Sequence, residues 1–419
     1  MKNNLAVVIL AAGKGERMKS DIPKVMHPLC GRPMIGYILD LAKELKASKI
    51  VAVLGHKHQQ IKPFLSVRVK PVIQKKLLGT ADAVKTALTQ LKGFSGTVLV
   101  LYADNPLLKK ETVAKLLKYH RENNLAATLL TAQVEKPAGY GRILRDKRAS
   151  IRGIVEEKDA DDFEKDIKEI NTGIICFNKK ALEQGLRLVR PNNRKKEYYL
   201  TDLVSILAQK EFLVDAVKLD DINEALGINA RPDLAKANNL MQQRINDGYM
   251  RKGVTIIDPA TTLIAFGAKI GRDSLIYPFT VIASDVIIGK HCSIGPFAHL
   301  REGTRLEDGV LLGNFVEVVR SKISRNTWAK HFSYIGDSRI GRQVNIGAGT
   351  VTANFDGVKK HLTVIKDNAF IGSDTVLVAP VNIGRKATTG AGAVVLAGSK
   401  VKDNTVVAGI PAKLLAKKR

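Results

Sequence analysis

Residues 269–300 read KIGRDSLIYPFTVIASDVIIGKHCSIGPFAHL, and an aliphatic side chain returns in this stretch at every sixth position. A six-residue period fits neither an α-helix, which repeats at about 3.6 residues, nor a simple two-faced strand. It is the signature of the hexapeptide β-helix, in which each repeat forms one side of a triangular coil and points its aliphatic residue at the axis. The spacing is unbroken at Ile264, Ile270, Ile276, Ile282, Ile288, Ile294, Leu300, Leu306 and Leu312.

The same period returns towards the end of the chain, so residues 253–419 are predicted to form roughly seven or eight coils. The phase is lost at 314–339 and again at 354–364, and both segments are predicted to leave the coil as loops. Such loops are where a solenoid carries its functional residues. The later repeats are Ile340 and Ile346, and then Ile365, Ile371, Leu377, Ile383, Thr389, Val395, Val401 and Val407.

The first 230 residues follow a different pattern, in which short apolar runs alternate with helical stretches. This alternation predicts an α/β domain with a mostly parallel sheet, whose ligands bind at the carboxyl ends of the strands. Residues 232–252 read as a helical linker, because Pro232 suits a helix start and one face is apolar. The predicted domains are therefore 1–231, 232–252 and 253–419. The runs expected as buried strands are Leu5–Leu10, Ile50–Leu54, Val98–Leu101, Ala126–Leu130 and Gly173–Phe177.

The composition limits the partners of this chain. Its 419 residues carry a formal net charge of +27, divided about equally between the two parts, and aromatic residues make up only 5%. Without a basic arm or stacking aromatics, nucleic-acid binding is not expected, and the charge favours phosphorylated substrates. No run approaches the roughly 20 apolar residues of a membrane span, so no membrane partner is expected. Three scattered cysteines form neither a disulfide framework nor a zinc pattern, and a cytoplasmic location is expected.

The loop after the first predicted strand is a candidate phosphate site. Leu10-Ala11-Ala12-Gly13 leads into Gly15, and Arg17 and Lys24 follow. Glycines allow backbone N–H groups to approach a phosphate closely, and the two cations add attraction. The loop is neither a dinucleotide fingerprint nor a Walker A motif, so taken alone an ordinary strand-to-helix turn remains open.

Further motifs, in order along the chain, carry a resemblance to a known family. The sequence resembles the bacterial bifunctional N-acetylglucosamine-1-phosphate uridyltransferase and glucosamine-1-phosphate acetyltransferase, which supplies a precursor of peptidoglycan. The resemblance implies a Rossmann-like nucleotidyltransferase domain followed by a left-handed parallel β-helix. The motifs are the loop from Leu10 to Lys24, Gln74, Leu78-Gly79-Thr80-Ala81, Tyr102-Ala-Asp104-Asn-Pro106, Gly139-Tyr-Gly141-Arg-Ile, Gly153-Ile-Val-Glu156, Ile170-Asn171-Thr-Gly173 and Glu197-Tyr-Tyr199-Leu-Thr201-Asp.

The resemblance assigns roles in uridyl transfer from UTP to N-acetylglucosamine-1-phosphate. Asp104 and Asn229 would hold Mg²⁺, which prefers few protein oxygens and completes its shell with phosphate and water. Arg17 and Lys24 would offset phosphate charge, since positioning and neutralisation suffice for this reaction. The nucleotide would contact Leu10, Ala11, Ala12, Gly13, Lys24, Gln74, Gly79 and Thr80, and the sugar phosphate would contact Gly141, Glu156, Asn171 and Thr201.

For acetyl transfer from acetyl-CoA to glucosamine-1-phosphate, the resemblance makes His331 the general base. An imidazole, with a reference pKa of about 6.5, suits removal of an amine proton at neutral pH. The amino sugar phosphate would contact Arg301, Tyr334, Asn345 and Lys360, and acetyl-CoA would contact Ala348, Asn354, Phe355, Ser373 and Ala391.

This chain departs from the family pattern at three positions that bear on these assignments. Ala103 replaces the usual glycine, Val319 stands where the family has a lysine for the substrate phosphate, and Gly409 stands where some members have a coenzyme-binding arginine. Arg320 is predicted to replace that lysine only if its strand slips by one residue, which would exchange its faces. Two alternatives therefore stay open: a uridyltransferase with a β-helix that serves only as scaffold, and a nucleotide-sugar sensor without activity. A homotrimer is expected from the resemblance.

Overall fold

The computed structural model describes residues 4–415 and divides the chain into two compact units. The N-terminal unit runs up to Leu29 and from Pro33 to Asn238, and the C-terminal unit comprises Cys30–Arg32 and the chain from Asn239 onward. Helix α8, Arg231–Met250, covers most of the segment predicted as a linker, and the division falls inside it. The predicted domain boundaries remain a prediction, and residues 1–3 and 416–419 of the two outer domains lie outside the described range.

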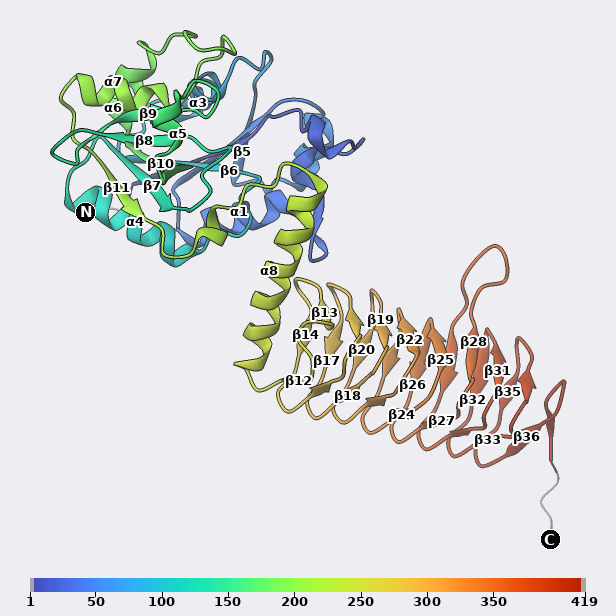
Figure 1. Ribbon diagram of the computed structural model, residues 1–419. Coiled ribbons are helices and arrows are strands. Elements are labelled where there is room, and N and C mark those ends of the chain that lie inside the picture. Colours follow the sequence, from blue (N-terminus) through green and yellow to red (C-terminus); the bar gives the residue numbers. More distant parts are fainter. Residues whose placement is uncertain (1–3, 416–419) are drawn as a thin grey trace. The chain divides into compact units, whose positions relative to one another are not determined.

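The N-terminal unit contains a mostly parallel sheet with helices around it, as predicted (Figure 1). Strand β10 runs antiparallel to both neighbours, while the other pairs along the main path are parallel. The antiparallel hairpin β8 (Arg142–Arg145) and β9 (Ile151–Val155) joins the sheet at β10. The strand order is β11 (Val214–Lys218), β7 (Ala127–Gln133), β10 (Glu169–Asn178), β6 (Thr97–Tyr102), β1 (Leu5–Ala11), β4 (Lys49–Leu54) and β5 (Val69–Ile73).

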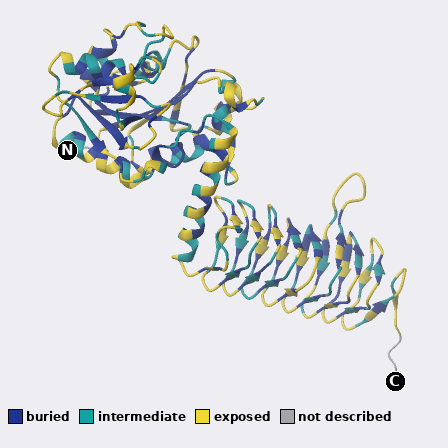
Figure 2. Cartoon of the chain, in the orientation of Figure 1, coloured by how far each residue is buried: buried dark blue, intermediate teal, exposed yellow. Residues whose placement is uncertain are grey.

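Strand β1 is buried on both faces because successive side chains point to opposite sides of a sheet. Leu5, Val7 and Ile9 belong to one apolar cluster, whereas Ala6 and Val8 belong to another. Figure 2 shows the resulting buried interior of this unit. A strand buried in this way fixes the position of the loop that follows it.

The helices of the N-terminal unit occupy the connections between strands. The α-helices are α1 (Met34–Glu44), α2 (His58–Ile61), α3 (Thr80–Leu88), α4 (Lys110–Glu122), α5 (Asp162–Lys165), α6 (Lys179–Leu186) and α7 (Asp202–Gln209). The short 3₁₀ helices are Glu16–Met18, Lys24–Met26, Lys62–Phe64, Thr89–Leu91 and Ile222–Ala225, and two short strands are β2 (Pro28–Leu29) and β3 (Arg32–Pro33). No helix within residues 4–415 is long and apolar enough to cross a membrane.

The C-terminal unit is the parallel β-helix predicted from the six-residue repeat, with strands stacked into three sheets. The first sheet contains β12 (Thr255–Ile256), β15 (Leu275–Ile276), β18 (Ser293–Ile294), β21 (Leu311–Leu312), β24 (Trp328–Ala329), β27 (Asn345–Ile346), β30 (Phe370–Ile371), β33 (Thr388–Thr389), β36 (Val406–Ala408) and the antiparallel β37 (Lys413–Leu414). The second contains β13 (Leu263–Ile264), β16 (Val281–Ile282), β19 (His299–Leu300), β22 (Val316–Val319), β25 (Ser333–Gly336), β28 (Val351–Ala353), β31 (Val376–Val378) and β34 (Val394–Val395). The third contains β14 (Lys269–Ile270), β17 (Ile287–Ile288), β20 (Arg305–Leu306), β23 (Lys322–Ile323), β26 (Ser338–Ile340), β29 (Thr363–Ile365), β32 (Val381–Ile383) and β35 (Lys400–Val401).

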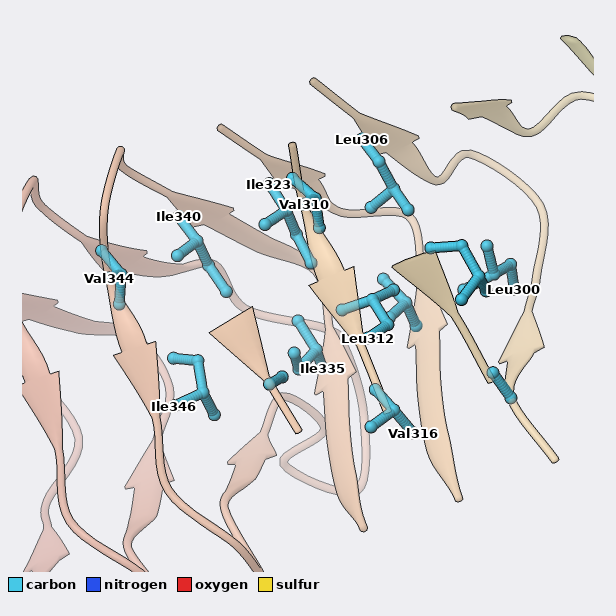
Figure 3. Close-up of a cluster of buried hydrophobic side chains, with 14 of the residues drawn as sticks. Leu300, Leu306, Val310, Leu312, Val316, Ile323, Ile335, Ile340, Val344 and Ile346 are labelled. Carbon is cyan, nitrogen blue, oxygen red and sulfur yellow. The ribbon is translucent and has the colours of Figure 1, made fainter. Parts of the chain in front are cut away.

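The aliphatic residue of each repeat packs along the axis of the coil. Figure 3 shows Leu300, Leu306 and Leu312 from three sides of the coil among the side chains of neighbouring coils. Each such residue buries its side chain against those above and below, and burial of a leucine or isoleucine stabilises by about 1.5–3 kcal/mol. The periodic aliphatic pattern is therefore what holds this unit together.

One of the two predicted loops is absent. Residues 314–339 do not leave the coil, because β22 to β26 pair in register with the coils on either side. Leu300 pairs with Val318, but Leu306 pairs with Ile323, so the corner between β22 and β23 is one residue shorter than the repeat requires. The corner between β25 and β26 is shortened in the same way, since Val318 pairs with Ile335 and Ile323 with Ile340. These two shortened corners, and not a loop, shift the phase. The second break is a loop, since residues 354–362 project between β28 and β29 (Figure 1).

Candidate active sites

The loop after β1 folds back so that Lys24 comes to lie over it. Gly15 has a positive φ of 67°, and a Cβ placed there would come within 2.7 Å of the Lys24 Cβ. Glycine is therefore required, both for the backbone conformation and for the close approach. Gly15 thus allows the loop to turn back and place Lys24 at the carboxyl end of the sheet.

The ammonium of Lys24 lies between two oxygen atoms from distant parts of the chain. Lys24 donates a hydrogen bond to the carboxylate of Asp104 and another, 3.1 Å long, to the amide oxygen of Asn229. Asp104 follows β6, and Asn229 lies two residues before α8, where the Asp233 carboxylate accepts from the Asn229 backbone N–H at 2.9 Å. A cation is thus held where the two predicted metal ligands converge.

A cavity of about 690 Å³ opens over this loop and is contained within the N-terminal unit. The structure brings together in its wall every residue predicted for the nucleotide, the metal and the phosphate charge of uridyl transfer. These are Leu10, Ala11, Ala12, Gly13, Arg17, Lys24, Gln74, Gly79, Thr80, Asp104 and Asn229. Further lining residues, to which the resemblance assigned no role, are Lys14, Gly15, Glu16, Val25, Leu77, Ala83, Tyr102, Lys195 and Glu197.

The wall around Gly79 is built from two segments far apart in the sequence. Gly79 has φ of 118°, and a Cβ there would lie 2.4 Å from the carbonyl oxygen of Tyr198. The Tyr198 N–H donates to the Leu78 carbonyl at 2.7 Å, which pins the two segments together. Gln74 donates to the Gly79 carbonyl at 3.1 Å and so joins the same wall. These contacts make the two segments one rigid edge of the cavity.

The four predicted sugar residues form one cluster next to the cavity. Thr201 donates a hydrogen bond of 3.0 Å to Glu156, and the Asn171 N–H donates to the Gly141 carbonyl at 2.8 Å. Gly141 lies beside Glu156, since a Cβ at Gly141 would be 3.5 Å from the Glu156 carboxylate. Tyr102, which lines the cavity, lies close enough to Glu156 and Asp104 for their charges to help burial raise its pKa. Tyr102 therefore connects the cluster to the cavity.

Burial raises the pKa of the Glu156 carboxyl, and the negative charge of Asp159 raises it further. The hydrogen bond from Thr201 and the charge of Lys195 act in the opposite direction. Asp202, nearby, has its pKa raised to about 6 by burial and by the charges of Glu156 and Asp159. This end of the site is thus acidic, which suits hydroxyl groups but opposes a phosphate.

In the β-helix, the predicted acetyl-transfer residues lie on two neighbouring corners. His331 follows β24 by two positions, as Ala348, Ser373 and Ala391 follow β27, β30 and β33, so these four stack at the corner between the first and second sheets. The side chain of His331 is exposed, and its carbonyl accepts a 3.0 Å hydrogen bond from Ser333. Asn345 lies on the first sheet, and Tyr334 lies on the second, between the two corners.

The other corner, between the second and third sheets, carries the remaining predicted cations. Arg301 follows β19 and donates to Glu317 at 2.8 Å. Asn354 occupies the same corner on a later coil, and the loop that it opens carries Phe355 and Lys360, which pair as an isolated bridge. A single chain therefore places His331 and the candidate phosphate-binding groups on opposite edges of the second sheet.

Arg320 lies at this second corner, and the slip of its strand on which its use was expected to depend does not occur. Strand β22 keeps its register, because Glu317 pairs with His299, and Val319 is only 1% exposed. Arg320 takes the left-handed conformation at the corner, with φ of 45°. Its guanidinium donates two hydrogen bonds of 2.7 Å to Asp337.

The Asp337 carboxylate accepts hydrogen bonds from both Arg320 and Asn354 at this corner. The paired hydrogen bonds from Arg320 lower its pKa most, and a hydrogen bond from Asn354 and the charge of Lys360 lower it further. Arg320 and Lys360 thus place two cations around one carboxylate.

Comparison with known proteins matches both units. Residues 7–166 match the model of the MobA-like NTP transferase domain. Residues 267–302 match the bacterial transferase hexapeptide (six repeats), and 363–397 match the hexapeptide repeat of succinyl-transferase. Fold and sites together define a nucleotidyltransferase joined to a left-handed β-helix of the hexapeptide transferase class.

Close relatives narrow this class. The chain is 42% identical to the bifunctional protein GlmU of Geobacillus sp. (strain WCH70), over 95% of this chain and 92% of the relative. It is 41% identical to bifunctional protein GlmU of Desulfitobacterium hafniense (strain DSM 10664 / DCB-2), over 99% and 96%. Among solved structures, the crystal structure of UDP-glucose pyrophosphorylase complexed with UDP-glucose matches with a TM-score of 0.48. The two sequences are 17% identical, and the match covers 57% of this chain and 99% of that chain.

The chain belongs to the family of bifunctional GlmU proteins. The predicted uridyltransferase and glucosamine-1-phosphate acetyltransferase activities are the two functions of this bifunctional family. The scaffold-only and sensor alternatives are not favoured.

Proposed function

We propose that the cavity of the N-terminal unit transfers the uridyl group of UTP to N-acetylglucosamine-1-phosphate. A phosphate oxygen of the sugar phosphate attacks the α-phosphorus, the bond from that phosphorus to the bridging oxygen breaks, and pyrophosphate leaves. The observation that carries this proposal is the convergence of Lys24, Asp104 and Asn229 at the floor of the cavity. Arg17 would offset phosphate charge from the same wall, as positioning and neutralisation dominate such reactions.

We propose Mg²⁺ as the metal of this site, held by Asp104 and Asn229. The donor set fits, because both offer hard oxygen atoms and a cationic group already lies between them in this structure. Within residues 4–415 there is no group of three or more His, Cys, Asp or Glu side chains that could hold a metal. Two protein ligands suit Mg²⁺, which takes its other ligands from phosphates and water. When bound, the ion would neutralise the triphosphate.

For the β-helix, we propose that His331 removes a proton from the amine of glucosamine-1-phosphate as its nitrogen attacks the thioester carbon of acetyl-CoA. A C–N bond forms, the C–S bond breaks, and the coenzyme A thiolate leaves and takes up a proton. The stack of His331 with Ala348, Ser373 and Ala391 supports this assignment, because it places the base in line with the candidate coenzyme positions.

We also propose a homotrimer located in the cytoplasm. His331 and Arg301 lie on different corners of one coil stack, so a second copy could bring the corner with the base to the corner with the cations. A closed ring of three copies would complete three identical sites. The cytoplasm is where UTP and acetyl-CoA would both be supplied.

One assay tests both proposed reactions. Purified protein is incubated with glucosamine-1-phosphate, acetyl-CoA, UTP and Mg²⁺, and N-acetylglucosamine-1-phosphate and its UDP derivative are measured separately. Both products are expected, and the second should disappear when acetyl-CoA is omitted and return when N-acetylglucosamine-1-phosphate is supplied. Formation of the UDP sugar from the acetylated substrate alone, with no acetylation at saturating amino sugar, would contradict the acetyl-transfer proposal.

Arg320 is proposed to supply the phosphate contact for which Val319 is unsuited. Arg320→Ala should raise the KM for glucosamine-1-phosphate by about 10-fold or more, because a charge-assisted hydrogen bond contributes about 1.5–3 kcal/mol. The kcat and the KM for acetyl-CoA should change by less than about threefold, since uniform binding affects KM alone. Steady-state kinetics with Arg339→Ala, an exposed arginine on the third sheet, as control would measure this. An unchanged KM would show that Arg301 and Lys360 suffice.

A further inference from the structure

The loop that closes the sugar side of the cavity carries three consecutive cations, Arg194, Lys195 and Lys196, and only Lys195 is among the cavity-lining residues. The family resemblance gives none of the three a role. The placement of Lys195 is therefore a feature of this chain's own structure that the assigned functions do not use.

This loop is held in place at both ends. The Asn193 side chain donates to the Glu197 carbonyl at 2.6 Å and accepts from the Glu197 N–H at 3.1 Å, so it closes the loop on itself. The Arg194 N–H donates to Asp159 at 3.1 Å, which ties the loop to the segment after Glu156. The hydrogen bond from Tyr198 to Leu78 ties the other end to the nucleotide wall. Lys195 consequently stands between the sugar cluster and the nucleotide cavity.

The charged groups around Lys195 favour a cation that can bind a phosphate at this position. The sugar end holds Glu156, Asp159 and Asp202, and the mutual repulsion of these carboxylates contributes to the raised pKa of Asp202. A sugar phosphate bound by Glu156 would bring a dianion towards these acids. Of the other cavity cations, Lys24 is paired with Asp104, Lys14 lies 3.5 Å from Glu16, and Arg17 belongs to the loop after β1, on the nucleotide side. Within the described residues, the Lys195 ammonium forms no ion pair.

We propose that Lys195 binds the phosphate of the sugar-1-phosphate and holds its attacking oxygen towards the α-phosphorus of the nucleotide. This inference rests on the uridyl transfer proposed above and names the group that receives the second substrate. An ammonium on a four-carbon stem can follow the phosphate as it changes from a free dianion to the diphosphate of the product.

Kinetics of the full-length protein with Lys195→Ala and Lys195→Gln test this role. The KM for N-acetylglucosamine-1-phosphate should rise about tenfold, the lower end for a charge-assisted contact because the lysine is exposed. The KM for UTP should change by less than about twofold, and Lys195→Arg should restore most of the affinity because it keeps the charge. Lys196→Ala is the matched control, since it removes the same charge from the next position, outside the cavity.

The two proposals fail in distinguishable ways. If the wild-type protein forms no UDP sugar, the uridyl transfer itself is wrong, whatever Lys195 does. If the wild type is active and Lys195→Ala matches Lys196→Ala in both KM values, the assignment of Lys195 is overturned. A rise in the KM for UTP alone would overturn it as well, because Lys195 would then belong to the triphosphate. Raising the salt concentration should reduce the difference between Lys195→Ala and wild type, as screening weakens exposed contacts.

Discussion

Asp104→Asn is expected to lower the rate of uridyl transfer by about a thousandfold. Stabilisation of the transition-state charge by a metal ion contributes several kcal/mol, and each loss of about 1.4 kcal/mol lowers the rate tenfold. The substitution preserves size and leaves one oxygen, but it removes the negative charge that attracts both Lys24 and a divalent cation. Acetyl transfer by the same preparation should stay within about twofold of wild type, since His331 and its neighbours belong to a separately folded unit with its own core.

The measurement is the initial rate of pyrophosphate release at saturating UTP and N-acetylglucosamine-1-phosphate, beside the rate of coenzyme A release with glucosamine-1-phosphate. Asp220→Asn is a suitable control, because the Asp220 side chain is 88% exposed and pairs with the surface Lys115. Addition of more Mg²⁺ should recover part of the lost rate if the variant binds the metal weakly. Equal loss of both activities in a folded variant would disprove the two separate sites.

The β-helix could be predicted from the sequence because one residue in six decides it. Each aliphatic residue at the axis packs against those of the coils above and below it, so every coil has the same aliphatic positions. The cause of the two phase breaks cannot be read from the six-residue period itself. A corner shortened by one residue, as between Val319 and Lys322, and a loop such as 354–362 both interrupt the period. Only the pairing of the strands on either side distinguishes them.

The nucleotide cavity was predictable to the extent that its residues follow strand ends. Leu10 and Ala11 end β1, Ala12 and Gly13 follow it, and Asp104 follows the neighbouring strand β6. Parallel strands bring their carboxyl ends to one edge of the sheet. Lys195 lies in an irregular loop far along the chain, and no period or motif marks it. Its position depends on hydrogen bonds from Asn193 and Arg194, which tertiary structure alone reveals.

Arg320 shows the same limit on the β-helix. The expectation from the sequence judged Arg320 by the alternation of a straight strand. Position 320 is instead a corner residue with positive φ, so its side chain does not follow the two-faced pattern. Its bidentate contact with Asp337 joins residues 17 positions apart, one short coil. Sequence reasoning that assumes regular strands fails at such corners.

His331→Asn should lower the kcat of acetyl transfer by about 10²–10⁴-fold, the usual contribution of a positioned general base. Asparagine keeps a polar side chain of similar size at this exposed corner but cannot accept the amine proton at neutral pH. The KM for acetyl-CoA and the whole of uridyl transfer should be nearly unchanged. His291→Asn, which alters an exposed histidine at a corner between the third and first sheets, is the control.

The pH profile separates a base from a merely structural histidine. If His331 must be neutral to act, log(kcat/KM) for the wild type falls at acidic pH, and this fall should be absent or reduced to that of the amine itself in His331→Asn. At high pH the free amine of glucosamine-1-phosphate is abundant. The kcat/KM of His331→Asn should then rise towards the wild-type value, because the reaction relies less on a general base. A variant whose activity is reduced by the same factor at every pH would assign His331 to packing or coenzyme binding. The base would then have to come from another residue at the same corner or from the facing corner of a second copy.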